Sequence, residues 1–235
     1  IEVFLLDQIK KLSEVYNVTV VLKAADPDFL TRRGIKADVI FAPIERKISL
    51  INDVRALFFL TKFFRDNSFD LVHSVTPKAG LLAMLAALFG DINIRIHMFT
   101  GQVWGSQRGL MRWILKSTDR ITALAATHVL TDSFTQRIFL INERVISEKK
   151  SSVLASGSIS GVDLERFKPD DILRKEVREK FGIPINELVF LFMARLTRDK
   201  GALVMAEAFS RFVDQGGEGH LIIVGPDEEK VSQMM

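Results

Sequence analysis

The chain has 235 residues, of which 48% are hydrophobic and 26% are charged, with 32 Lys and Arg, 29 Asp and Glu, and no Cys. These proportions are typical of a folded globular protein with one large or two smaller domains. The absence of Cys excludes disulfides and thiolate metal sites, and a net charge of +3 is too small to indicate a nucleic-acid partner.

Neither a transmembrane helix nor a signal peptide is indicated by the hydrophobic pattern. The longest apolar run, residues 80–90, is well short of the about 20 residues that a membrane span needs. The first 16 residues lack the basic and then apolar order of a signal peptide. We therefore expect a cytoplasmic protein. Because the chain begins at Ile1 and ends soon after a strand-like segment, we also expect a fragment of a longer protein.

Helical and strand patterns alternate along the chain. Apolar residues at helical spacing predict helices near 5–16, 53–66, 77–90, 109–125, 134–141, 172–184 and 201–214. Runs rich in β-branched and apolar residues predict strands at 17–23, 37–44, 69–75, 92–99, 127–133, 151–156, 188–194 and 220–224. This alternation with short connections predicts an α/β fold of parallel sheets, in which the last two strands are buried on both faces. The polar segment 157–171 is the predicted boundary between an N-terminal domain, 1–168, and the start of a second, 169–235.

Three cations follow the predicted strand in the segment VFLFMARLTRDKG, residues 189–201: Arg195, Arg198 and Lys200. Ligands of open α/β sheets bind beyond the carboxyl ends of the strands, where the next helix favours an anion. A cation at a helix N-terminus is unfavourable by roughly 0.3–1 kcal/mol, and a multiply charged anion would reverse that sign. The spacing alone leaves two interpretations open, a diphosphate site and a solvated surface turn.

Five motifs, in order along the chain, resemble those of the retaining, nucleotide-sugar-dependent glycosyltransferases of family 4. They are H-S-V-T-P-K-A-G-L-L at 73–82, H-M-F-T-G-Q-V-W at 97–104, G-S-I-S-G-V-D at 157–163, G-V-D-x-x-R-F-x-P from 161 and R-L-x-x-x-K-G from 195. The resemblance implies the GT-B architecture of two Rossmann-like parallel-sheet domains, with the second incomplete in this chain. It also implies a UDP- or GDP-linked sugar donor, a lipid-linked saccharide acceptor of bacterial surface glycans, retention of configuration, and no metal or other cofactor.

The resemblance assigns roles to particular residues. Arg195 and Lys200 match the pair that grips the donor diphosphate, and Gly225 matches the loop that approaches the nucleotide base. Thr100 stands, next to Gly101, where many relatives carry a histidine that contacts the transferred sugar, and His97 lies three residues earlier. Either Thr100 or His97 would contribute to catalysis, although His97 also fits a core histidine of the predicted strand.

The remaining implied contacts concern the acceptor. Thr76 and Lys78 begin a predicted helix at the carboxyl end of a strand and, with Gly101, would lie on the acceptor side. The opening strand and the widely spaced glutamate pair of relatives are not recognisable in the sequence. We therefore expect the chain alone to be weakly active or inactive.

Four alternatives stay open at this point. Asp26-Pro27-Asp28 matches the D-x-D metal motif of another glycosyltransferase architecture, but a turn explains it better. The Phe-rich segment 55–65 is compatible with an anionic inner-membrane surface, whereas Phe58, Phe59 and Phe63 also suit a helix that covers a sheet. A nucleotide-sugar epimerase and a non-catalytic partner in glycan assembly are the alternative functions.

Overall fold

The computed structural model describes residues 5–23, 26, 28–45 and 49–234. The chain divides into two compact units, Ile1–Val162 and Asp163–Met235, so that the division falls inside the polar segment 157–171. Within the described residues, every pair of neighbouring strands runs parallel. The predicted α/β class with parallel sheets is confirmed.

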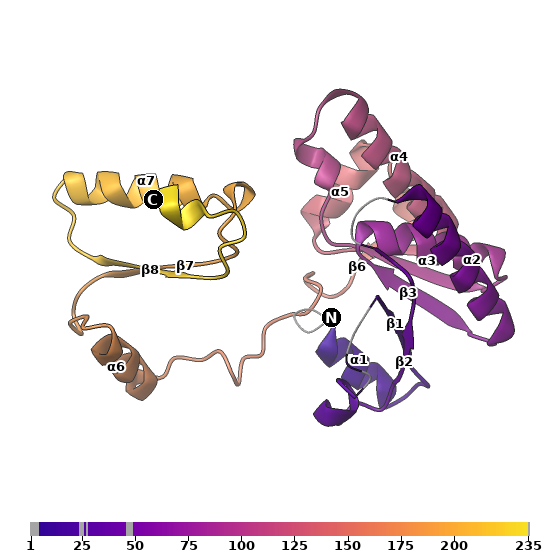
Figure 1. The fold of residues 1–235 in the computed structure, drawn as a ribbon, viewed down its shortest axis with the longest axis horizontal. Coiled ribbons are helices and arrows are strands. Elements are labelled where there is room, and N and C mark those ends of the chain that lie inside the picture. Colours follow the sequence, from indigo (N-terminus) through magenta and orange to yellow (C-terminus); the bar gives the residue numbers. More distant parts are fainter. Residues whose placement is uncertain (1–4, 24–25, 27, 46–48, 235) are drawn as a thin grey trace. The chain divides into compact units, whose positions relative to one another are not determined.

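The first unit contains a four-stranded sheet in the order β3 (Leu71–Val75), β4 (Ile94–Phe99), β5 (His128–Thr131) and β6 (Ser151–Val153). A separate two-stranded sheet pairs β1 (Thr19–Leu22) with β2 (Asp38–Phe41). The helices of this unit are α1 (Leu6–Ser13), α2 (Leu50–Asp66), α3 (Pro77–Phe89), α4 (Gly109–Ala125) and α5 (Phe134–Asn142) (Figure 1). Each lies in or close to a range where the sequence predicts a helix.

Helix α3 lies between α2 and α4 (Figure 1). Its sequence is apolar on all sides, which is typical of a helix that is enclosed rather than exposed. Met84, Ala86 and Ala87 are completely buried in the main core of the unit. Small residues also permit close packing: a Cβ on Gly80 would lie 2.3 Å from the ring of His97.

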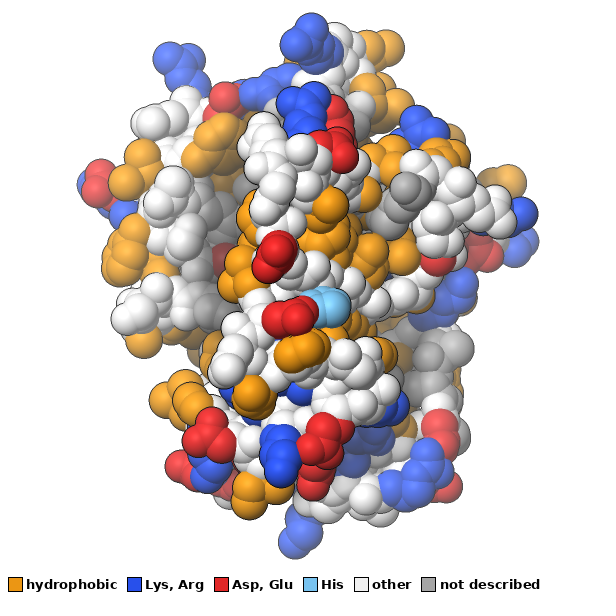
Figure 2. All heavy atoms as spheres, turned by 90° about the vertical axis from the view of Figure 1, so that its left-hand side faces the viewer, with side chains coloured by type: hydrophobic (Ala, Val, Ile, Leu, Met, Phe, Trp, Pro, Cys, Tyr) orange, Lys and Arg blue, Asp and Glu red, His pale blue; other side chains and the backbone are white. Residues whose placement is uncertain are grey.

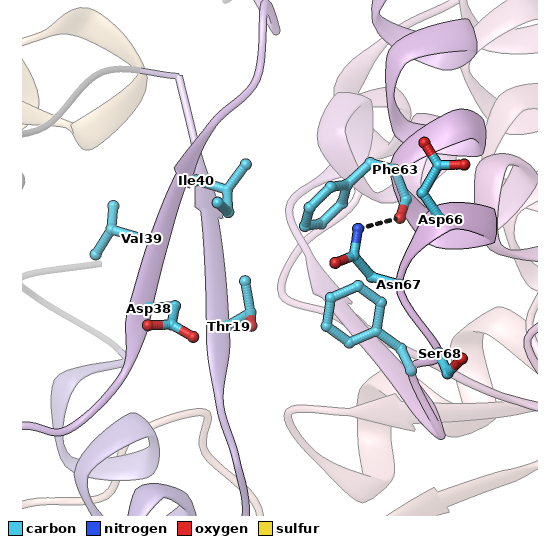
Figure 3. A pocket seen from close by; sticks show the side chains of 9 residues that line it. Thr19, Asp38, Val39, Ile40, Phe63, Asp66, Asn67 and Ser68 are labelled. Carbon is cyan, nitrogen blue, oxygen red and sulfur yellow. Dashed lines mark hydrogen bonds between the residues drawn. The ribbon is translucent and has the colours of Figure 1, made fainter.

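The two sheets of the first unit are not joined by strand pairing in the described residues, although Val21 of β1 packs against the main core. Among the described residues, β1 pairs only with β2, and β3 pairs only with β4. A mainly apolar cavity of about 720 Å³ is lined on one side by Val21 of β1 and on the other by Leu60 and Val72. A second cavity of about 580 Å³, drawn in Figure 3, has strand residues such as Ile40 on one side and Phe63 on the other.

The second unit has two parallel strands, β7 (Val189–Met193) and β8 (His220–Val224), with α6 (Asp171–Lys180) and α7 (Ala202–Asp214). Helix α7 packs on one face, where the Phe190 ring contacts those of Phe209 and Phe212. On the other face, Leu191 and Met193 are 63% and 74% exposed. The prediction that these strands are buried on both faces is therefore wrong for the described residues, because only the α7 side of this short sheet is covered.

Helix α2 likewise covers the core with only part of its aromatic surface. Phe63 contacts the rings of Phe64 and Phe69, whereas Phe58 is 72% exposed. The interpretation that Phe58, Phe59 and Phe63 all cover a sheet is therefore wrong for Phe58.

On the face drawn in Figure 2, hydrophobic side chains lie among Lys, Arg, Asp and Glu side chains, so charges of both signs share this surface.

Candidate functional site

The turn after β7 is built on close backbone contacts with the end of β8. The amide of Ala194 donates to the carbonyl of Val224 at 3.0 Å, and the amide of Leu196 donates to that of Pro226 at 2.8 Å. Gly225 has φ +148°, and a Cβ there would lie 1.8 Å from the Ala194 carbonyl oxygen. Only glycine fits this position, so the two strand ends are held together at the point where Arg195 leaves the sheet.

The cations of this turn lie on its surface beside carboxylates. The Arg195 guanidinium contacts the Glu228 carboxylate at 2.8 Å, and each side chain is about half exposed. The Lys200 side chain is exposed just before α7 and has no hydrogen bond or ion pair among the described residues. The Thr197 hydroxyl and the charges of Lys200 and Arg195 lower the pKa of Asp199. An anion bound by Arg195 and Lys200 would therefore meet an unpaired Lys200 side chain and compete with Glu228 for Arg195.

The predicted acceptor-side residues of the first unit lie at the carboxyl edge of its larger sheet. Thr76 follows β3 and Thr100 follows β4, and the register pairs Val75 with Met98, so these two strands end at the same edge. Thr100 and Gly101 are exposed, and a Cβ on Gly101 would meet no atom within 4 Å. Thr76 has φ +76°, an unusual conformation for a β-branched residue. The fold thus brings Thr76, Thr100 and Gly101 to one edge.

His97 lies in the core beneath that edge. It is 1% exposed, its Nδ1 is 2.8 Å from the Ser74 hydroxyl, and its ring packs edge-on against Phe99. Burial and the neighbouring His73 lower the pKa of His97 to about 4, so the imidazole is neutral at pH 7. The structure therefore agrees with the core interpretation of this histidine, and its predicted contact with a substrate stays a prediction.

Lys78 connects two helices. Its Nζ lies 2.5 Å from the Asp53 carboxylate of α2, and both side chains are mostly buried. The second carboxylate oxygen of Asp53 accepts from the Ser49 amide at the start of α2, at 3.2 Å. This ion pair gives Lys78 a structural role in joining α3 to α2. The predicted contact between Lys78 and the acceptor stays a prediction.

Trp104 anchors the loop that carries Thr100, and sequence reasoning missed it. Its indole Nε1 donates to Asp119 of α4 at 2.7 Å, and its ring stacks on Phe139. The Arg112 guanidinium lies over the same ring and donates to the Trp104 carbonyl at 3.0 Å. The signal available in the sequence was Asp119, the one acidic residue of α4, which lies on the inward face of the helix.

A second set of polar side chains that the sequence analysis did not identify connects the ends of β4 and β5. The Asp132 amide donates to the Gln136 side chain at 2.7 Å, and Gln136 in turn donates to Gln102 at 3.4 Å. One Asp132 carboxylate oxygen and the Gln102 amide nitrogen are buried without a hydrogen-bond partner in the described structure. Burial raises the pKa of Asp132. These groups border the edge that carries Thr100.

The Asp26 carboxylate contacts residues close to it in the sequence. One of its carboxylate oxygens accepts from the Asp28 amide at 3.0 Å, and the other contacts Arg32, an ion pair that lowers the pKa of Asp26. Pro27, the middle residue of the D-x-D match, lies outside the described residues. This arrangement agrees with a turn. Over the part of the chain that the structure describes, no three His, Asp or Glu side chains are grouped closely enough to hold a metal ion.

None of the helices in the described residues is both long and apolar enough to cross a lipid bilayer.

Two curated bacterial proteins are similar to the chain in sequence. The "Capsular polysaccharide biosynthesis glycosyltransferase CapM" of Staphylococcus aureus is 28% identical over 191 residues, covering 81% of this chain and 50% of the relative. The "UDP-Gal:alpha-D-GlcNAc-diphosphoundecaprenol alpha-1,3-galactosyltransferase" of Escherichia coli is 28% identical over 223 residues, covering 92% and 56%. The chain thus spans about half the length of these relatives.

Solved structures share the fold at low sequence identity. Anabaena Alr3699/HepE, crystallised with UDP and glucose, matches with a TM-score of 0.68 and 16% identity, over 97% of this chain and 58% of that one. The UDP-GlcNAc 2-epimerase of Neisseria meningitidis matches with a TM-score of 0.64 and 18% identity, over 97% and 64%. Both are similar in fold, which by itself does not separate a transferase from an epimerase.

The model of the family "Glycosyltransferase Family 4" matches residues 1–157. This range is more than half of the chain and contains the whole larger sheet of the first unit. Together with the parallel α/β architecture, this match shows that the chain belongs to glycosyltransferase family 4, as the five sequence motifs indicated.

Proposed function

We propose that the protein transfers a sugar from a UDP-linked donor to a lipid-linked saccharide during the assembly of a bacterial surface polysaccharide. Its family, and the functions of the relatives from Staphylococcus aureus and Escherichia coli, support the reaction class and the pathway type. The Escherichia coli relative uses UDP-Gal and a diphosphoundecaprenol-linked sugar, which supports the choice of donor base and acceptor.

The observation that carries the proposal is the turn after β7. Arg195 and Lys200 are both exposed there, and Gly225 brings the end of β8 against the backbone beside Arg195. Arg provides planar two-point contacts to a phosphate, and Lys provides a mobile point charge. As the bond between sugar and diphosphate breaks, negative charge grows on the departing oxygen. Two fixed cations would stabilise that charge without a protein nucleophile or a metal ion.

In this proposal, Thr100 and Gly101 lie on the acceptor side with Thr76. Their shared edge is open, and the loop that carries Thr100 is anchored through Trp104 and Asp119. His97 acts as a positioning residue, since its buried ring supports β3 through Ser74 and packs against Gly80. We also propose that the transfer retains the anomeric configuration of the sugar.

Binding of UDP to the 235-residue chain, measured by calorimetry with and without EDTA, tests the donor site. Arg195→Ala and Lys200→Ala should each weaken binding by at least about tenfold, because each removes a charge-assisted contact to phosphate. Arg211→Ala is the matched control, since this exposed arginine lies on α7 and pairs only with Glu207 among the described residues. Binding that EDTA abolishes, or binding that neither site variant weakens, would contradict the proposed site.

Product analysis then tests the reaction. Incubation of the protein with a labelled UDP-sugar and a lipid-diphosphate saccharide should yield a new glycoside, and NMR of its anomeric proton should show retention. An epimerase is the second candidate, because the fold is shared with a UDP-GlcNAc 2-epimerase. Formation of a free epimerised sugar without any acceptor would select that candidate instead.

A further inference from the structure

The strands β4 and β5 end next to each other at the carboxyl edge of the larger sheet. The register pairs Phe99 with Thr131, so Thr100 and Asp132 are the first residues beyond the paired part of these neighbouring strands. The loop that starts at Thr100 also carries Gln102, which is connected to the end of β5 through hydrogen bonds. The edge assigned to the acceptor therefore carries a carboxylate and an amide to which the proposed function gives no role.

A chain of hydrogen bonds determines which atom of Gln102 is left without a partner. The Asp132 backbone amide can only donate, so the Gln136 atom that it contacts at 2.7 Å is the side-chain oxygen. The Gln136 nitrogen then donates to Gln102 at 3.4 Å, so the Gln102 atom in this contact is also an oxygen. What remains of Gln102 is its amide nitrogen, a hydrogen-bond donor.

Two groups of opposite hydrogen-bonding character are thus unsatisfied at this edge. The Gln102 nitrogen and one Asp132 carboxylate oxygen are buried without a hydrogen-bond partner in the described structure. Burial raises the pKa of Asp132, and no nearby cation opposes this shift. Both residues are partly exposed as a whole, so they border the surface of the edge. Because unpaired buried polar groups are costly, both favour a ligand that supplies the missing partners.

The segment that follows β6 holds the Asp132 backbone in place. The Ser158 amide donates to the Asp132 carbonyl at 2.6 Å, and a Cβ on Gly157 would lie 2.3 Å from the same carbonyl oxygen. Ser158 has φ +71°, a conformation that residues with a side chain rarely adopt. Backbone strain of this kind clusters at functional sites. The G-S-I-S-G-V-D motif therefore has a structural role, which is to fix Asp132 at the edge.

A hydroxyl group can satisfy both unpaired groups, because it donates one hydrogen bond and accepts another. A phosphate would be repelled by the Asp132 carboxylate, and an ammonium group has no lone pair to accept from Gln102. We propose that Asp132 and Gln102 bind one hydroxyl of the acceptor saccharide, which donates to the carboxylate and accepts from the amide. This inference rests on the proposed function and adds to it the two residues that select the acceptor sugar.

Binding of monodeoxy sugars to the 235-residue chain tests the pair. The probe is α-N-acetylglucosaminyl diphosphate with a short alkyl chain, whose sugar is that of the acceptor of the Escherichia coli relative. Its 3-deoxy, 4-deoxy and 6-deoxy forms each lack one hydroxyl. In calorimetry, one of these forms should bind the wild-type protein at least about tenfold more weakly than the parent probe. The reason is that a site built to hydrogen-bond a hydroxyl rejects the analogue that lacks it.

Asp132→Ala and Gln102→Met should each weaken binding of the parent probe by at least about tenfold. Each variant should also bind the parent probe and the discriminated deoxy form with nearly equal affinity, because the contact that distinguishes them is lost. A purely structural role would instead weaken all four probes by the same factor. Asp70→Ala is the matched control, since this exposed carboxylate precedes β3 at the opposite edge of the sheet. It should bind all probes as the wild type does.

The outcomes separate this inference from the proposed function. Discrimination that persists in Asp132→Ala and Gln102→Met would overturn the pair and leave the transfer reaction intact. Equal binding of all four probes to the wild type, or no binding of any probe, would also overturn the pair, since water would then be the partner of both groups. If the protein forms no glycoside but still discriminates the deoxy forms through Asp132, the pair is supported as a sugar-binding site and the proposed function fails.

Discussion

The contact between Arg195 and Glu228 competes with any anion that binds the turn after β7. The two groups are 2.8 Å apart and both are about half exposed, so the pair contributes only about 0–1 kcal/mol. Glu228→Gln should therefore tighten UDP binding, by no more than about fivefold, in a calorimetric titration. Glu207→Gln, which breaks the similar pair with Arg211 on α7, should leave UDP affinity unchanged. Weaker binding in Glu228→Gln would show that the carboxylate itself contacts the ligand.

Asp119 gives a prediction that does not depend on any ligand. Burial raises the pKa of this carboxyl from 3.8 to about 6, although its hydrogen bond from Trp104 acts in the opposite direction. A carboxyl whose pKa is raised in the folded state destabilises the fold as it ionises, so stability is lost as pH rises from about 4 through 6. The total effect is up to about 3 kcal/mol.

Asp119→Asn should remove this pH dependence, because the amide oxygen can still accept the Trp104 hydrogen bond without ionising. Urea unfolding at a series of pH values checks the prediction. The stability of Asp119→Asn relative to the wild type should rise between pH 4 and pH 6 and then level off. A difference that stays constant over this range would show that Asp119 titrates normally.

Single residues also show what the sequence can and cannot indicate. The pattern of cations after a strand pointed to Arg195 and Lys200, and the structure exposes both beside the end of β8. Glu228, the partner of Arg195, could not be identified from the sequence, because it is 33 residues away and meets Arg195 only in the folded unit. The burial of His97 depends on Ser74 and Gly80 from other elements, so periodicity alone left its role open.

At the scale of elements, helix α6 depends on its first residues rather than on packing. None of its residues is buried, and its N-cap Asp170 accepts a hydrogen bond from the Leu173 amide at 2.9 Å. Asp170→Ala should destabilise the helix by about 1 kcal/mol and therefore speed amide exchange in residues 171–180 by about fivefold. Asp170→Asn retains the cap and should exchange at nearly the wild-type rate. Equal exchange in both variants would mean that packing, and not the cap, holds α6.

Periodicity predicted the order of the elements well, because local hydrophobic patterns define each helix and strand on their own. It did not predict which faces of these elements would be covered. Leu191 of β7 and Trp113 of α4 belong to apolar patterns that normally indicate a buried face, yet both are more than half exposed. Coverage depends on neighbouring elements, and a local pattern carries no information about them.

At the scale of the whole molecule, the connection between the two units is mostly exposed. Residues 154–170 contain no helix or strand, and Arg166 and Lys168 are exposed. Brief digestion with trypsin should therefore cut first at Arg166 or Lys168 and release two fragments, which mass spectrometry would identify. Early cleavage inside α3 or α4 would instead indicate that the first unit opens before the connection is cut.

The separation of β1–β2 from β3–β6 has a consequence for how this polypeptide behaves when concentrated. Residues of β1 and β3 line the same apolar cavity. In the described residues, each of these strands has one edge whose backbone amides and carbonyls pair with no neighbouring strand. Such edges can template the pairing of other extended chains. Handling at high concentration should therefore promote self-association rich in β-structure, and a short apolar peptide that fits the cavity would suppress it.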